Sequence, residues 1–306
     1  MGILFQGKRP AAAAMIMAAM AAAGLGASAA NAAVLFTDNF NATGTTNTNN
    51  LNFNLSGREG GTLGTGGNIT WSGSGNTQVG NTTGGINNGN YLLTAFGGSA
   101  SPNANFVGSE TGPITISFDE AVNVGSYSDT TIWGSIVVGL DSTDQTSFIN
   151  AGNANDFGIL FRSNGGIQAF QGGNVITGGT ALPNWDGGIG TSDHTTDMNP
   201  VTLVISGQNG TGSGFTGSGT EIQVYAGSTP TSTPSLIATY STAAGGGLTN
   251  ALTTNYINFG AVNNGIAGTE NLSVSEAVPE PAAIATLGVG CIGLLLARRR
   301  NTRNAI

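Results

Sequence analysis

Short runs in which apolar and polar residues alternate are the feature that most restricts the fold of this chain. In residues 114–119, 157–162 and 201–205, apolar side chains occupy every second position. Clusters of Gly, Asn and Ser separate such runs, and there is almost no helical periodicity between residues 33 and 277. Because successive side chains of a strand point to opposite faces, this pattern predicts an all-β, antiparallel protein.

The turns between these runs also predict β-hairpins. Asn164-Gly165-Gly166 separates 157–162 from 167–170, and Asn-Gly supplies the positive φ angles that a tight hairpin turn needs. The Gly-rich stretch 207–219 is expected to be a long hairpin loop, since it lacks the lysine of a phosphate-binding loop. Further strands are expected at 34–36, 51–55, 69–71, 91–96, 222–224, 236–240, 256–259 and 272–274.

The N-terminus has the order of parts found in a secretory signal peptide. Two basic residues precede an apolar run, residues 11–27, and small residues follow. We expect residues 1–32 to be removed, with Ala30 and Ala32 as the small residues of the cleavage site. Cleavage after residues 27–29 is one alternative, and a buried Ala-rich helix is another.

The C-terminus has three ordered parts within residues 278–300. The apolar run 282–297 has 16 residues, slightly fewer than the ~20 that span a bilayer comfortably. As a helix it would be roughly 24 Å long. We expect it to be a single transmembrane helix with a short cytoplasmic tail, 301–306, because arginines stay on the cytoplasmic side. An ordinary membrane anchor is the alternative. The flanking motifs are Pro279, Glu280 and Pro281 before the helix and Arg298, Arg299 and Arg300 after it.

This C-terminal arrangement resembles the PEP-CTERM sorting signal of Gram-negative bacteria. The resemblance implies transient recognition by an exosortase, a membrane transpeptidase-like enzyme. It also implies passage through the inner membrane to an exopolysaccharide-rich cell surface or extracellular matrix. Cys291, the one cysteine of the chain, lies in the apolar run, so no intrachain disulfide and no thiolate zinc site can form.

The remaining domain, residues 33–277, is strongly acidic. It has 15 acidic side chains and two basic ones, Arg58 and Arg162, which gives a net charge of −13. Nucleic-acid binding requires lysines and arginines on phosphates, so this composition argues against it. The length suits one β-domain with a buried core.

The strand pattern of this domain resembles a concanavalin A-like jelly-roll β-sandwich of the laminin-G-like type. The residues that carry the resemblance are 156–162 with 165–170, and 256–260 with 271–274. In that fold the first and last strands are neighbours in one sheet. The resemblance therefore implies that residues 34–36 pair with 272–274.

The sequence offers little support for catalysis. Hydrolysis of a glycosidic bond uses two carboxyl groups on one face, whereas the adjacent Asp119 and Glu120 would point to opposite faces of a strand. The acids of the expected strands are otherwise isolated, and no Glu-x-Asp-x-x-Glu pattern exists. His194, the one histidine, lies in a polar loop and is expected to be solvated.

Binding residues are sought in the loops. Trp185, with Asn184 and Asp186 beside it, is the candidate for contacting sugar, with packing over a sheet edge as the alternative. No cofactor is predicted; Asp141 and Asp144 are candidate Ca²⁺ ligands, with a solvated turn as the alternative. The other tryptophans, Trp71 and Trp133, are expected in the core.

Three functions follow from these observations. The first is a non-enzymatic, exported surface or matrix protein that is associated with exopolysaccharide. The second is a lectin-like carbohydrate-binding module, with or without calcium. The third is a polysaccharide hydrolase, for which the sequence provides no cluster of acids.

Overall fold

The computed structural model describes most of the β-domain. The predicted signal peptide, the predicted sorting motif and the helix predicted at 282–297 lie outside the described residues. In the described part of the chain, no helix is long and apolar enough to cross a membrane. The described residues all belong to one compact unit, Ala32–Ala277. They are 32–40, 55, 58–64, 66–74, 77–80, 91–95, 97–103, 112–123, 133–140, 155–162, 167–176, 198–207, 219–227, 231, 233–252, 256–262 and 266–277.

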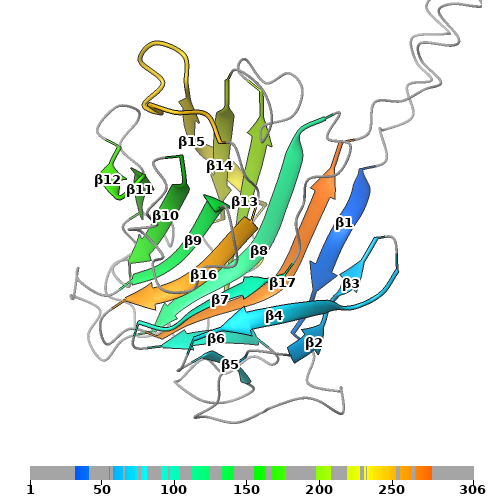
Figure 1. The fold of residues 1–306 in the computed structure, drawn as a ribbon. Coiled ribbons are helices and arrows are strands. Elements are labelled where there is room, and N and C mark those ends of the chain that lie inside the picture. Colours follow the sequence, from blue (N-terminus) through cyan, green and yellow to red (C-terminus); the bar gives the residue numbers. More distant parts are fainter. Residues whose placement is uncertain are drawn as a thin grey trace, which may run out of the picture. The chain divides into compact units, whose positions relative to one another are not determined.

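Two antiparallel sheets form a β-sandwich (Figure 1). Sheet A contains, in spatial order, β15 (Ser235–Ser241), β14 (Glu221–Ala226), β13 (Asn199–Ser206), β8 (Ile114–Asn123), β17 (Ile266–Glu276), β1 (Ala33–Asp38) and β3 (Thr62–Leu63); β6 (Tyr91–Ala95) also pairs with β17 and with β5 (Thr77–Gly80). Sheet B contains β12 (Asn174–Val175), β11 (Ile167–Gln171), β10 (Phe157–Arg162), β9 (Trp133–Leu140), β16 (Tyr256–Val262), β7 (Ser99–Pro102), β4 (Ile69–Gly73) and β2 (Arg58–Gly60). The expected all-β, antiparallel sandwich is confirmed.

The alternation in the sequence corresponds to the two faces of each strand. Along β13, Val201, Leu203 and Ile205 are fully buried, whereas Thr202 and Val204 between them are partly exposed. The same alternation runs along β14 and the first part of β8. The inward-facing side chains of both sheets belong to one hydrophobic core between the layers.

The predicted pairings occur with the expected partners. β10 and β11, on either side of residues 163–166, are paired, and so are β13 and β14, which flank the Gly-rich stretch. The first and last strands are neighbours: Phe36 is paired with Val274 and Asp38 with Leu272. Figure 1 shows this contact as the blue strand β1 beside the orange strand β17.

Aromatic rings connect the two layers at the centre of the sandwich. Phe118 of sheet A packs edge-on against Phe161 and Phe259 of sheet B, with ring centroids 6.3 and 5.5 Å apart. Such edge-to-face pairs add about 1 kcal/mol each to the free energy gained by burial. Phe157 and Tyr240 form another contact between the sheets. Burial raises the pKa of Tyr240 to about 12.

A hydrogen bond also joins the sheets beneath the pairing of β1 with β17. The indole Nε1 of Trp71, on β4, donates to the Asp38 Oδ2 atom at the end of β1 over 2.8 Å. The other carboxylate oxygen of Asp38 accepts from the backbone N–H of Phe40. Asp38 is 2 % exposed, so these donors replace the water that the carboxylate loses on folding.

Candidate functional site

The binding residues predicted from sequence are not among those that the structure describes. Trp185, its neighbours Asn184 and Asp186, and the acids Asp141 and Asp144 lie in the stretches 177–197 and 141–154. These assignments, like that of His194, therefore stay predictions. Within the described ranges, no three His, Cys, Asp or Glu side chains gather in a group that could hold a metal ion.

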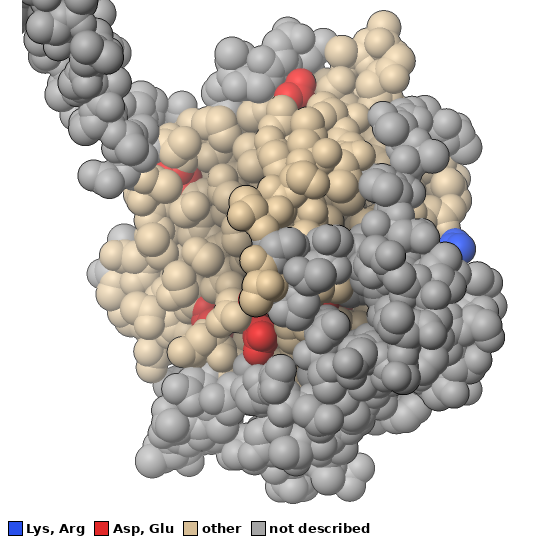
Figure 2. All heavy atoms as spheres, turned by 180° about the vertical axis from the view of Figure 1, so that it is seen from behind, with Lys and Arg blue, Asp and Glu red and all other residues tan. Residues whose placement is uncertain are grey.

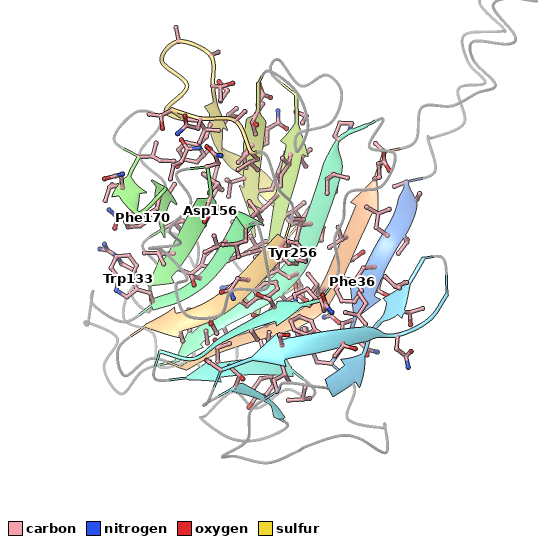
Figure 3. The ribbon with its side chains drawn as sticks, viewed as in Figure 1. Phe36, Trp133, Asp156, Phe170 and Tyr256 are labelled. Atoms are coloured by element: carbon pink, nitrogen blue, oxygen red, sulfur yellow. The ribbon has the colours of Figure 1, made fainter. Side chains whose placement is uncertain are left out.

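An aromatic and cationic cluster lies instead on the outer face of sheet B. Trp133, the first residue of β9, is 6.2 Å from Phe170 of β11 between ring centroids, and Figure 3 shows the two side chains close together. The guanidinium carbon of Arg162 lies 4.3 Å from the centroid of the Trp133 ring. Arg162 Nη2 donates to Gln168 Oε1 over 2.6 Å. We name these four residues the Trp133 cluster.

The placement of Trp133 corrects the expectation that it belongs to the core. Its neighbours two and four residues along β9, Ser135 and Val137, are buried on the same outer face, whereas Trp133 is only half-buried. Opposite Trp133, on β10, lies Arg162. Trp133 is therefore partly exposed beside the side chains of Arg162 and Gln168. Trp71, in contrast, is fully buried, as predicted.

Apart from the Trp133 cluster, the described part of this outer face has a small apolar cluster, Val137 and Leu140 with Tyr256, and several buried polar side chains. Asn258 Nδ2 donates to Ser101 Oγ over 2.9 Å, and Ser135 Oγ donates to the carbonyl of Gly260. The side chains of Asn258, Ser101 and Ser135 are at most 1 % exposed. Arg162 and Gln168 of the Trp133 cluster are, in contrast, half-buried.

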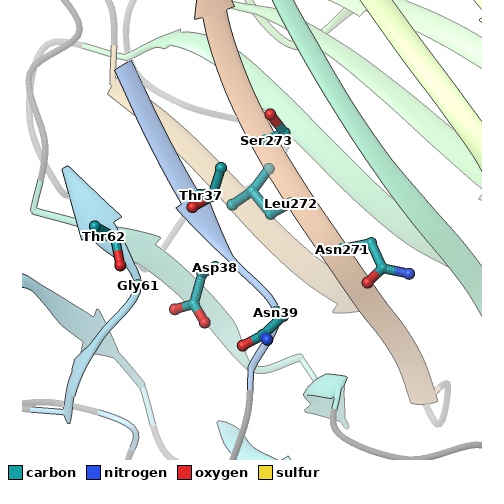
Figure 4. A pocket seen from close by; sticks show the side chains of 8 residues that line it. All are labelled: Thr37, Asp38, Asn39, Gly61, Thr62, Asn271, Leu272 and Ser273. Carbon is teal, nitrogen blue, oxygen red and sulfur yellow. The ribbon is translucent and has the colours of Figure 1, made fainter. Parts of the chain in front are cut away.

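A polar pocket lies on the other sheet, where the end of β1 meets β3 and the middle of β17. Its volume is about 350 Å³, within the range of small-ligand pockets. Hydroxyl groups of Thr37, Thr62 and Ser273 line it together with the carboxamide of Asn271 (Figure 4). Asn271 has φ +52° at a β-bulge of β17, and its Nδ2 donates to Asp119 Oδ2 over 2.7 Å.

Two carboxyl groups adjoin this pocket, a pairing that the sequence did not indicate. Asp119 of β8 is directly opposite Glu270 of β17, which places their Cβ atoms about 5 Å apart. Burial, and then the negative charge of Asp119, raise the pKa of Glu270 to about 7. Burial also raises the pKa of Asp119, against the effect of its hydrogen bond from Asn271. Two negative charges at this position are therefore unfavourable, and Glu270 keeps its proton up to a pH of about 7.

A third acid, Glu120, points inward. It is 1 % exposed, and Thr269 Oγ1 donates to its Oε2 atom over 2.6 Å. Burial raises the pKa of Glu120 well above its usual range, and the hydrogen bond from Thr269 only partly opposes this effect. A Cβ atom on Gly134, in the facing strand β9, would lie 2.6 Å from Glu120 Oε1, so glycine makes room for this carboxyl. Glu120 is thus a structural group.

The pH dependence of stability tests the carboxyl pair. The pKa of Glu270 is about 7 in the folded chain and near 4.5 in the unfolded chain, so the folded state binds more protons between these values. The free energy of unfolding should therefore fall as pH rises through this window. We expect Glu270→Gln to remove most of the fall contributed by the pair and to be more stable than wild type at pH 8, as measured by urea denaturation from pH 4 to 8.

Two further variants sharpen this measurement. Asp119→Asn removes the repelling charge and should flatten the pH dependence in the same direction. Ser275→Ala, on the same face of β17 and away from the pair, should leave the dependence unchanged. If the free energy of unfolding of Glu270→Gln fell with pH as steeply as that of wild type, Glu270 would not titrate in this window.

Comparison with known proteins does not assign the chain to a family. No protein-family model and no curated protein sequence matches the chain. Among solved structures, the receptor-binding domain of botulinum neurotoxin mosaic serotype C/D has a TM-score of 0.46 at 14% identity; the alignment covers 86% of this chain but 52% of that one. This chain thus spans about half the length of that structure.

Two lectins are also similar in structure. The lectin from Bauhinia forficata in complex with GalNAc has a TM-score of 0.40 at 9% identity, over 79% of this chain and 97% of the lectin. Lectin II from Ulex europaeus has a TM-score of 0.40 at 12% identity, over 74% of this chain and 99% of the lectin. Similarity at these scores carries no inference about ligand or activity.

Proposed function

We propose that this chain is an exported cell-surface or matrix protein whose domain, a concanavalin A-like jelly roll, binds polysaccharide without reacting with it. The observation that supports binding is the partly exposed Trp133 with Arg162 and Gln168 beside it. Aromatic rings cover the apolar faces of sugar rings, and guanidinium and amide groups hydrogen-bond their hydroxyls. Convergent polar groups around an aromatic surface are typical of small-ligand sites.

Export and sorting rest on the two ends of the chain. The signal peptide with its cleavage site at Ala30 and Ala32 starts secretion, and the motif Pro279-Glu280-Pro281 with the apolar helix and the arginines directs the protein to an exosortase. The strongly acidic domain, with a net charge of −13, suits a soluble extracellular location. Recovery of the native protein from the cytosol with both termini intact would contradict this part of the proposal.

Binding and its loss in a Trp133 variant form the central test. On a glycan array, we expect the full-length chain to bind, and Trp133→Ala to lower affinity roughly tenfold or more because the stacking surface is lost. Trp133→Phe keeps an aromatic ring and should retain part of the affinity. Leu236→Ala, which trims another exposed apolar side chain on sheet A, is the matched control and should bind like wild type.

The same array separates the alternatives. Trp185→Ala tests the loop predicted from sequence, and repetition with and without calcium tests a role for Asp141 and Asp144. A chain that binds no glycan in either condition would be a structural surface protein only. Unchanged binding in both tryptophan variants would contradict an aromatic sugar site. A hydrolase, the third function, would release reducing ends from a bound glycan, and the pair Asp119 and Glu270 is where its acids would be sought.

A further inference from the structure

Hydroxyl groups form one continuous row across the outer face of sheet A. Each member is directly opposite the next on the neighbouring strand. One is exposed and the others are half-buried, so all of them reach solvent. The row, which we name the hydroxyl row, consists of Thr62, Thr37, Ser273, Ser117, Thr202 and Tyr225, on β3, β1, β17, β8, β13 and β14.

The pleat of the strands sets the hydroxyl row on the outer face. Ser117, for example, lies between the buried core residues Ile116 and Phe118. Because alternate side chains of a strand point to opposite faces, the hydroxyl of Ser117 points away from the core. The flanking strands β17 and β13 repeat this arrangement, with Ser273 and Thr202 next to the buried Val274 and Leu203.

Spacing and twist determine what shape of ligand fits. Neighbouring strands are about 4.8 Å apart, so six residues extend over about 24 Å. Adjacent strands are rotated by about 20° relative to one another, and the row therefore turns gradually along its length. Such a surface matches one extended polysaccharide chain better than the flat face of a crystalline polysaccharide.

The row has polar groups in fixed positions along its length. In the middle, the hydroxyls of Ser117 and Thr202 are hydrogen-bonded to each other over 3.2 Å, which leaves acceptor positions free for a ligand. At one end, the Tyr225 hydroxyl donates to Gln223 Oε1 over 2.8 Å. At the other end, Thr37, Thr62 and Ser273 line the polar pocket of Figure 4.

The charges of this face select an uncharged ligand. No member of the row is charged, and both described arginines, Arg58 and Arg162, belong to sheet B. Seen from behind relative to Figure 1, the described surface carries small acidic patches among uncharged residues, with one basic group at its right edge (Figure 2). With Asp119 and Glu270 in the adjoining row of the sheet, an anionic polymer would be repelled.

We infer that the hydroxyl row binds a single, extended, neutral polysaccharide chain, with one sugar unit in the pocket lined by Thr37, Thr62 and Ser273. Serine and threonine hydroxyls both donate and accept, as sugar hydroxyls do. This site is separate from the Trp133 cluster, because the two lie on outer faces of different sheets. A molecule with both sites would bridge two polysaccharide chains.

Titration of the full-length chain with cellohexaose, an extended neutral hexasaccharide, tests this inference. We expect Ser117→Ala with Thr202→Val, and separately Thr37→Val with Ser273→Ala, to weaken binding about fivefold for each hydroxyl removed. Valine keeps the shape and strand preference of threonine, and the two pairs lie in different parts of the row, so loss of folding in one leaves the other informative. Thr70→Val, which removes an exposed threonine hydroxyl from sheet B, should bind like wild type.

Four other outcomes would decide the inference, three of them against it. Stronger binding of polygalacturonate than of cellohexaose would contradict the selection of a neutral chain. Dimerisation that is detected by sedimentation and abolished by the same variants would assign the row to a second copy of this chain. If only Trp133→Ala weakens binding, the hydroxyl row is not a site and the proposed function still stands. If the row variants weaken binding and Trp133→Ala does not, the row is the site and the Trp133 cluster is structural.

Discussion

Trp71→Ala is expected to lower the free energy of unfolding by about 4 kcal/mol or more. The indole is fully buried and packs against Phe36 and Phe40, with centroids 6.4 and 5.3 Å away. Truncating a buried aromatic residue to alanine costs about 3–5 kcal/mol. The loss of its N–H from the buried carboxylate of Asp38 adds a cost of about 1–3 kcal/mol. Urea denaturation followed by circular dichroism measures the change.

Conservative variants separate the two contributions. Trp71→Phe keeps most of the ring and removes the donor, so it should cost about 1–3 kcal/mol. Asp38→Asn keeps the shape of the acceptor and should cost less than removing Trp71 altogether. A change below about 1 kcal/mol in Trp71→Ala would mean that the two sheets are not held together at this point.

Gly61→Ala is expected to cost about 3 kcal/mol. Gly61 has φ +80°, a left-handed conformation that costs other residues about 1 kcal/mol. A Cβ atom there would also lie 2.5 Å from Phe36 Cε2 and 2.7 Å from the carbonyl oxygen of Thr37. Backbone atoms of the paired strand β1 cannot move aside easily, so overpacking adds a further 1–3 kcal/mol or so.

Gly66→Ala is the matched control. Gly66 has φ +86°, and nothing lies within 4 Å of the position of its Cβ. It should therefore cost only about 1 kcal/mol, and the effect of alanine on the unfolded chain is the same in both variants. Equal destabilisation in the two variants would show that β1 and β3 separate to admit the methyl group.

The sequence predicted strands best where one face of the sheet is buried and the other reaches solvent. The alternation along β8, β13 and β14 located their strands and inner residues correctly. β9 was missed because Gly134 to Leu140 are buried on both faces, which removes the alternation. β7, Ser99–Pro102, was missed because its small residues have no apolar pattern.

The candidate sites depended on neighbours that are distant in sequence. Asp119 and Glu270 were each isolated acids in the sequence and form a pair only because β8 adjoins β17. Trp133 was assigned to the core from its neighbours in sequence, whereas the structure places it opposite Arg162 on the outer face of sheet B. The pairing of β1 with β17 was expected from a resemblance to a fold, not from the residues themselves.

The chain alone thus determined its all-β class, most of its strands and the inward-facing residues of those strands. Tertiary structure decided which strands are neighbours, and with them the carboxyl pair, the Trp133 cluster and the hydroxyl row. The reason is that a period of two records the face on which each side chain lies. The register between strands depends instead on packing and hydrogen bonds across long separations in sequence, which a local pattern does not contain.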